Sequence, residues 1–117
     1  MTRIAANTLY GSIDLLILRT LHNAGPLHGL GIANEIRRIS DEELHIEEGA
    51  LYPALHRLKR EGFITGEWRI SDKNRRARFY SLTDQGRAEL EQTLQDWLRH
   101  TGMMCRVLKV ARGDIEL

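Results

Sequence analysis

Residues 49–82 read GALYPALHRLKREGFITGEWRISDKNRRARFYSL and predict one amphipathic helix followed by a hairpin. The helix is expected over Gly49–Glu61, and Gly62 supplies its stop because glycine tolerates the left-handed conformation that often ends a helix. Its core face consists of apolar side chains at the i, i+4, i+7 spacing, which are Leu51, Leu55 and Leu58. We place Pro53 in the first turn, where N–H groups have no partner inside the helix, so the helix is expected to start close to Gly49.

The hairpin is predicted from two β-prone runs, Phe63–Ile70 and Ala77–Leu82. The polar stretch between them, residues 71–76, favours a longer loop over a tight turn. Because this stretch and its flanks are rich in arginine and lysine, the tip of the hairpin is expected to be strongly cationic.

Two further helices are expected upstream. Apolar side chains recur at helical spacing over Leu9–Ala24, and Gly25-Pro26 ends the pattern. A second, short helix is expected to begin near His28 and to end by Ser40. The following Leu44–Ile46 is too brief and too rich in β-prone residues to continue a helix, so we expect a connection with a short strand there.

The last third of the chain predicts one long helix. Thr83 is a suitable N-cap, and Asp84 places a negative charge where the helix dipole favours it. An apolar seam with alternating spacings of four and three, typical of paired helices, runs along it through Leu90, Leu94, Trp97, Thr101, Met104, Leu108 and Ala111. Gly102 is a weak point because glycine disfavours the helix interior, and the end is expected at Gly113.

Composition limits the function classes. With 117 residues and 42% hydrophobic residues, the chain forms one modest core, which excludes a two-domain enzyme. The net charge is only +1, so a basic surface must come from segregated charges. Acidic residues cluster between Asp41 and Glu48, and basic residues cluster between Arg57 and Arg78. The middle of the chain is therefore expected to face an anionic partner.

Several other features point to a reducing compartment without a cofactor. The single cysteine, Cys105, excludes an intramolecular disulfide. Met1–Ala6 lacks the apolar core of a secretion signal, and no apolar run approaches the roughly 20 residues that span a bilayer. We therefore expect a cytoplasmic location. The histidines share no metal-ligand spacing, so no metal and no other cofactor is expected.

Three helices followed by a hairpin with a basic tip is the order of a winged helix-turn-helix, in which the third helix enters the major groove of DNA. We expect a mostly α fold with a small β-hairpin wing. Residues 1–82 would form the DNA-binding domain, and residues 83–117 would form a C-terminal dimerisation helix and tail.

Site residues follow from this fold. His56 and Arg57 are expected to project away from the core and to reach base edges, whereas Tyr52, Lys59 and Arg60 are better placed for phosphates. The full set of DNA-binding candidates is His28, Gly49, Ala50, Tyr52, Pro53, His56, Arg57, Lys59, Arg60, Lys73, Arg75, Arg76 and Arg78. The dimerisation candidates are Leu90, Leu94, Trp97, Thr101, Met104 and Leu108.

Four motifs are spread over residues 11–86: GSIDLLIL at 11–18, GPLHGLGI at 25–32, EGALYPALHRL at 48–58, and RRARFYSLT at 75–83 followed by Gly86. Together they resemble the motifs of PadR-type transcriptional regulators. The resemblance implies a homodimer built through the C-terminal helix, a cytoplasmic location and repression of promoters with inverted-repeat sites. Leu30 departs from the pattern, since members often carry tyrosine there. No inducer is identified by these motifs.

Alternatives remain for the function and for single residues. A winged-helix protein-interaction module that uses the C-terminal seam without binding DNA is the second hypothesis, and the wing arginines argue against it. An enzyme is disfavoured because there is neither a nucleophile elbow nor a glycine-rich phosphate loop. In the alternative for single residues, Tyr52 and Pro53 only shape the start of the helix and pack beneath the wing, and the wing arginines form a solvated loop. Arg57 and Lys59 would then be ordinary surface charges or partners of Glu61. Trp97 either packs in the core or lines a pocket for a flat ligand across a dimer axis.

Overall fold

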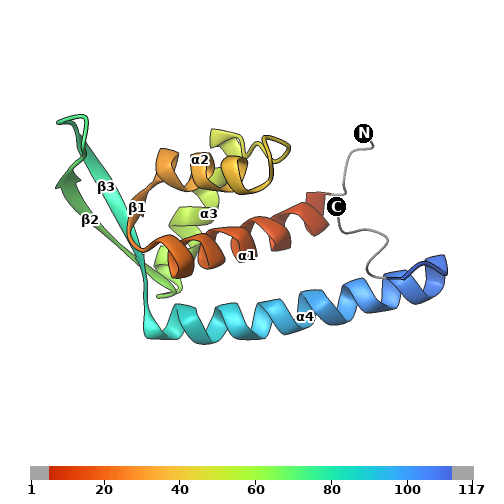
Figure 1. Cartoon of the computed structure of the whole chain (residues 1–117). Coiled ribbons are helices and arrows are strands. Elements are labelled where there is room, and N and C mark those ends of the chain that lie inside the picture. Colours follow the sequence, from red (N-terminus) through yellow and green to blue (C-terminus); the bar gives the residue numbers. More distant parts are fainter. Residues whose placement is uncertain (1–5, 112–117) are drawn as a thin grey trace.

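The computed structural model describes residues 6–111, with side chains from Ile13 onward. Its elements, in chain order, are α1 (Ala6–Ala24), β1 (Leu27–His28), α2 (Gly29–Ile39), α3 (Glu48–Arg60), β2 (Ile64–Ile70), β3 (Arg76–Leu82) and α4 (Asp84–Leu108). Figure 1 shows α1, α2 and α3 packed together, with the hairpin β2–β3 projecting at one end. The long helix α4 lies along α1 and extends past it at the other end (Figure 1). The expected winged helix-turn-helix with a long last helix is confirmed.

The core lies between the first three helices and the base of the hairpin. Its most deeply buried large side chains are Ile17, Leu18, Ile32, Leu51, Leu55, Leu58 and Ile64. The leucine face predicted for the third helix is therefore confirmed. Burying one such side chain stabilises the fold by about 1.5–3 kcal/mol, so these leucines fix α3 rigidly against α1 and α2. Leu90 of α4 joins the same cluster, which ties the start of the last helix to the core.

The sheet has the strand order β1-β3-β2, and both pairings are antiparallel. The predicted hairpin is confirmed within a residue at each strand end, but β1 was not predicted. It consists of two residues, with Leu27 paired to Tyr80 and His28 paired to Phe79. A strand this short shows no alternation in the sequence, and it exists only because β3 offers a free edge.

The prediction of a short strand at Leu44–Ile46 is wrong, since these residues form an irregular connection. The chain leaves α2 through Asp41 and Glu42, whose φ angles of 54° and 69° lie in the left-handed region. The Ser40 hydroxyl accepts a hydrogen bond from the Leu44 N–H at 2.9 Å. Both features turn the backbone into a loop, away from the sheet.

Two helix boundaries differ from those expected. Because α3 starts at Glu48, Pro53 is its sixth residue and lies in the second turn, not the first. Proline therefore removes the N–H that would pair with the Gly49 carbonyl, and Gly49 is exposed to solvent, which can satisfy that oxygen.

The end of α4 is the second difference. Gly102 does not interrupt the helix, and the end expected at Gly113, which lies outside the described residues, comes at Leu108. Lys109 takes the left-handed conformation with φ 59°, and the Val110 N–H bonds the Cys105 carbonyl at 3.0 Å. This is the pattern of a Schellman motif, here without glycine.

The predicted N-cap of α4 is confirmed, and it anchors the helix to the base of the hairpin. The Thr83 hydroxyl accepts from the Gly86 N–H at 2.9 Å and donates to the Gly62 carbonyl at 2.7 Å. A Cβ on Gly86 would lie 1.9 Å from the Phe63 carbonyl oxygen, so only glycine allows this approach. In the part of the chain that the structure describes, none of the helices has the length and apolar character of a membrane span.

Candidate nucleic-acid interface

The outer face of α3 lies opposite the buried leucines. Its exposed residues are Gly49, Tyr52, Pro53, His56, Lys59 and Arg60, and Ala50 is half-buried beside them. A helix held by its apolar face and free on its polar face has the form needed to enter the major groove. The structure therefore brings together most of the side chains expected on this surface.

Arg57 is the exception, and the expectation that it projects away from the core is wrong. Its guanidinium makes an ion pair with the Asp14 carboxylate on α1, and both side chains are about two-thirds buried, with exposed fractions of 32% and 28%. Helical geometry places position 57 at the edge of the outer face, next to α1. Arg57 therefore fixes α3 against α1, and its partner is Asp14 rather than Glu61.

Asp14 was missed by the sequence analysis. Burial raises the pKa of the Asp14 carboxyl above its usual range, and the hydrogen bond and charge of Arg57 lower it, offsetting this only in part. The signal was present in the sequence, since Asp14 is the acidic residue within the apolar run of the first helix. A carboxylate that such a run carries into the protein interior is usually paired with a cation.

A groove of about 380 Å³ lies between the wing and the helices α2 and α3. Four cationic side chains of the hairpin line it, which are Lys73, Arg75, Arg76 and Arg78. Tyr52 of α3 and the first residues of α2 form its other wall. The basic wing tip predicted from the sequence thus faces α3 across one concave surface.

Charges on this surface lack acidic partners. Among the described residues, no ion pair engages Lys59, Arg60 or the four cations of the wing groove. On α2, by contrast, Arg37 pairs with Glu42 at 2.9 Å and Arg38 pairs with Glu35 at 2.5 Å. The positive charge available to an anion is therefore concentrated on α3 and the wing, although the net charge is small.

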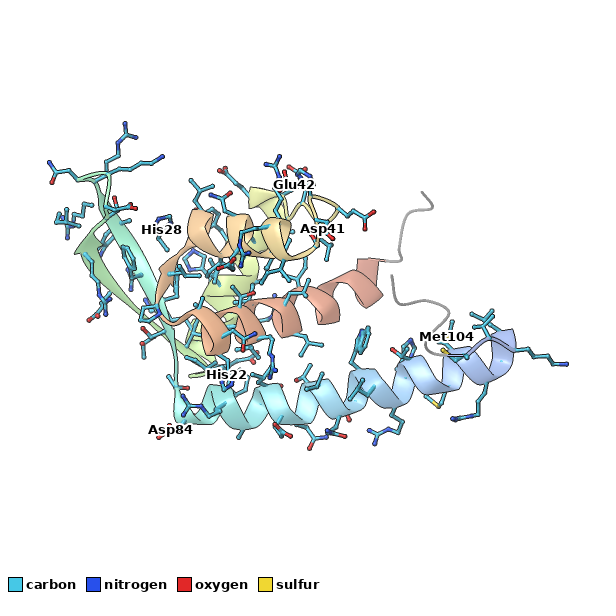
Figure 2. All side chains as sticks on the ribbon, in the orientation of Figure 1. His22, His28, Asp41, Glu42, Asp84 and Met104 are labelled. Carbon is cyan, nitrogen blue, oxygen red and sulfur yellow. The ribbon has the colours of Figure 1, made fainter. Side chains whose placement is uncertain are left out.

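His28 has a structural role at the edge of this groove. Its Nδ1 accepts a hydrogen bond from the Gly31 N–H at 2.9 Å and so caps α2. The ring stands edge-on to Phe79 of the wing, with 5.3 Å between centroids. Figure 2 shows His28 between the start of α2 and the hairpin. Only Nε2 is left for a further partner.

Tyr52 packs and lines the groove at once. A Cβ on Gly29 would lie 2.8 Å from the Tyr52 hydroxyl oxygen, so the phenol ring rests on the first residue of α2. Tyr52 is nevertheless 38% exposed. It therefore packs against the start of α2 and also lines the groove beside the wing.

The expected dimerisation seam divides into two parts. Leu90 and Thr101 are buried within the chain, and Leu94 is half-buried, so these residues do not form an outer surface. Trp97, Met104 and Leu108 are exposed, as are Met103 and Val107, which were not predicted. Met104 lies on the part of α4 that extends past α1 (Figure 2). An exposed apolar surface of this kind is typical of a protein contact.

Comparisons with known proteins identify the family. Residues 17–92 match the Transcriptional regulator PadR-like family. The chain is 36% identical over 77 residues to a transcriptional regulator of Mycobacterium tuberculosis, a match that covers 64% of this chain and 68% of that protein. It is 27% identical to a transcriptional regulator from Clostridium thermocellum of known structure, with a TM-score of 0.78 over 89% of this chain and 97% of the other.

A second solved structure agrees with this match. A PadR family transcription regulator from Clostridium difficile is 30% identical, with a TM-score of 0.69 over 82% of this chain and 97% of the other. The fold, the outer face of α3 and the basic wing are those expected of such a regulator. The chain therefore belongs to the PadR-like family of transcriptional regulators.

Proposed function

We propose that this regulator is a sequence-specific DNA-binding repressor that acts as a homodimer on an inverted-repeat operator. The observation that carries the proposal is a set of cations without an ion pair among the described residues: Lys59 and Arg60 are exposed on α3, and four wing cations line one groove. DNA phosphates are the partner that such a surface attracts, and an exposed helix beside it supplies contacts to bases.

Each part of the surface has a proposed role. Gly49 and Ala50 let the start of α3 approach the DNA closely. His56 lies at the centre of the outer face and contacts base edges, while Tyr52, Lys59 and Arg60 contact phosphates. The wing cations Lys73, Arg75, Arg76 and Arg78 contact the backbone beside the groove. Pro53 shapes the outer face, and His28 fixes the start of α2 next to the phosphates.

Arg57 takes a different role from the one expected at first. Its ion pair with Asp14 orients α3, so base reading falls to His56 and its neighbours on the outer face. This division leaves the positive charge of Lys59 and Arg60 free for DNA.

The dimer uses the exposed apolar part of α4. Two copies of Trp97, Met104 and Leu108 would pack across a two-fold axis and remove this surface from water. The two α3 helices of such a dimer meet half-sites spaced by about 10 base pairs or a multiple of that number. We propose that residues 1–82 form the DNA-binding domain and that residues 83–117 form the dimerisation helix and tail.

The competing function is a protein-interaction module that does not bind DNA, for which the apolar surface of α4 alone would suffice. The unpaired cations favour DNA binding, because a protein-docking role gives them no partner. We infer no enzymatic activity and no cofactor, and a small-molecule inducer remains to be found by experiment. A regulator of DNA works in the compartment that holds the chromosome, so we propose a cytoplasmic location.

The test is a binding titration with the region upstream of the protein's own operon, followed by selection of bound sequences from a random pool. Nanomolar binding that weakens steeply with salt, together with a palindromic selected motif, supports the proposal. Binding of equal strength to every sequence contradicts the specific role of α3. No binding at low salt contradicts DNA recognition altogether.

A further inference from the structure

Trp68 of β2 is an exposed aromatic residue surrounded by arginines. It is 54% exposed and lies directly opposite Arg78 in the β2–β3 register. The guanidinium carbon of Arg76 lies 4.7 Å from the centroid of the indole ring, and that of Arg78 lies 5.6 Å from it. Both distances are within the range at which a cation is attracted to an aromatic face.

The pleat of the hairpin explains why these side chains meet. Alternate residues share one face of a strand, so Trp68 lies on the same side as Arg76 and Arg78. Gly66 occupies the position before Trp68 on that face, and a Cβ there would lie 2.8 Å from Arg78 Nε. The side chain of Arg78 therefore crosses β2 through the space that glycine leaves. Its Nε is buried and has no hydrogen-bond partner among the described residues.

Arg69, on the other face of the same hairpin, is held in a different way. It lies over Phe79 at 5.6 Å, and its guanidinium also pairs with the Glu67 carboxylate. A carboxylate holds an arginine strongly but cancels its charge. An aromatic face restrains a guanidinium and leaves its charge available. Arg76 and Arg78 lie against the aromatic face of Trp68, and both line the groove beside α2 and α3.

We propose that Trp68 is a positioning residue of the wing: its indole face, with the space left by Gly66, holds Arg76 and Arg78 in place for the DNA backbone before DNA arrives. The proposal rests on the DNA-binding function proposed above. An arginine side chain loses conformational freedom when it is fixed at an interface. Restraining two of them in the free protein reduces that loss on binding.

The first measurement uses the free protein and is independent of DNA. NMR relaxation of the arginine Nε–H groups gives an order parameter for each guanidinium. We expect Arg76 and Arg78 to be more ordered than Arg75, and Trp68→Ala to lower the order of both. Trp68→Phe, which keeps an aromatic face, should retain much of it. Gly66→Ala should disturb Arg78 more than Arg76, because the added Cβ meets Arg78.

The matched control is Ile70→Ala. Ile70 is an exposed apolar residue on the same strand and the same face, but it has no ring. Its truncation should leave the order parameters of Arg76 and Arg78 unchanged. Equal loss of order in Ile70→Ala and Trp68→Ala would overturn the proposal, because any apolar neighbour would then serve.

The second measurement is DNA affinity at one fixed salt concentration. Trp68→Ala removes no charge, yet we expect it to weaken binding by about three- to tenfold, with Ile70→Ala unchanged and Trp68→Phe in between. Its salt dependence should match the wild type, whereas Arg76→Ala should reduce the salt slope by about one.

Two results would overturn the positioning role. One is wild-type affinity in Trp68→Ala. The other is a weakened affinity with unchanged arginine order, which would mean that Trp68 itself touches DNA. A third result would separate this proposal from the proposed function. If the order parameters changed as expected but the wild type bound no DNA, Trp68 would still hold the two arginines in place. The proposed DNA-binding function would then be wrong, and so would the role of Trp68 in DNA binding.

Discussion

Two surfaces of the molecule leave different kinds of side chain without a partner. The first is the outer face of α3 with the wing groove, and the second is the outer part of α4 around Trp97 and Met104. Along α3 and the wing groove, cations such as Arg60 and Arg75 have no acidic partner among the described residues. On the outer part of α4, Arg99 pairs with Asp96 at 2.5 Å, while large apolar side chains such as Trp97 and Met104 are exposed. The first surface has cations without an ion pair, and the second has apolar side chains exposed to solvent.

The difference shows that pairing, and not the number of charges, marks a binding surface. The chain carries 17 basic and 16 acidic residues, so its net charge gives no hint of an anionic partner. Ion pairs on α2 and α4 join several arginines to acidic side chains, whereas six cations of α3 and the wing have no ion pair among the described residues. We therefore propose a different partner for each surface, DNA for the first and a second copy of the chain for the second.

The largest expected effect comes from breaking the α4 surface. Met104→Glu combined with Leu108→Glu places charges on exposed apolar positions, so the fold of each chain should persist while the dimer is lost. Operator affinity should then fall by about 10²–10⁴-fold, because the two half-sites are no longer bound by one linked molecule. Sedimentation and a binding titration measure both effects. Gln95→Glu, at an exposed polar position, is the control. A wild-type protein that sediments as a monomer at micromolar concentration would refute the dimer.

The next effect should separate base reading from phosphate contact on α3. His56→Ala should reduce discrimination between operator and random DNA by about 1–3 kcal/mol and should relax the preference at one or two positions of each half-site. Lys59→Ala should weaken binding to all sequences alike. Selection from a random pool shows the difference. If the His56→Ala variant selects the wild-type motif, base reading lies elsewhere on the outer face.

A smaller effect should distinguish free cations from paired ones. Arg75→Ala removes an unpaired charge from the groove, so the slope of log affinity against log salt should fall by about one. Arg37→Ala removes a charge already paired with Glu42 and should leave the slope nearly unchanged. Anisotropy titrations at several salt concentrations give both slopes. Equal slopes for the two variants would mean that pairing does not decide which cations meet DNA.

The smallest effect concerns Arg57, the α3 cation that is paired. Burial raises the pKa of Asp14, and Arg57→Gln should raise it further because it removes the hydrogen bond and charge that lower it. A titration of the Asp14 carboxyl by NMR measures this shift. A pKa that fell on removal of Arg57 would contradict the ion pair.

The raised pKa of the Asp14 carboxyl also determines how the stability of the fold should depend on pH. Since its pKa is raised in the folded state from an ordinary value of 3.8, Asp14 contributes stability that is fully present below that value and is lost as pH rises through the folded pKa. In Asp14→Asn this loss is absent, so stability should decline less with rising pH across that window. Urea unfolding at several pH values compares the two slopes. Identical slopes would show that Asp14 does not titrate differently in the folded state.

Local patterns in the sequence predicted the elements, but not the contacts between distant ones. The leucine spacing, the polar loop of the hairpin and the Thr83 cap each act within a few residues, so α3, the wing and the start of α4 were expected correctly. Strand β1 depends on the free edge of β3, which lies about fifty residues later, and its two residues carry no pattern of their own.

The site shows the same limit. The basic wing was evident from composition, but Arg57 and Asp14 are 43 residues apart, and only the packing of α1 on α3 brings them together. The apolar seam was recognised as one stripe, although Leu90 and Thr101 are buried within the chain and only Trp97, Met104 and Leu108 are exposed. Periodicity shows that a face is apolar, but it does not show which partner covers it.

The most direct test of the two-surface account is to map the amide chemical-shift changes of the dimer when operator DNA is added. The largest changes should fall on the outer face of α3, at the start of α2 and on the wing from Lys73 to Arg78. Residues around Met104 on α4 should change little, because in the proposed dimer they face the second copy of the chain. Changes concentrated on α4, with α3 and the wing unaffected, would contradict the account.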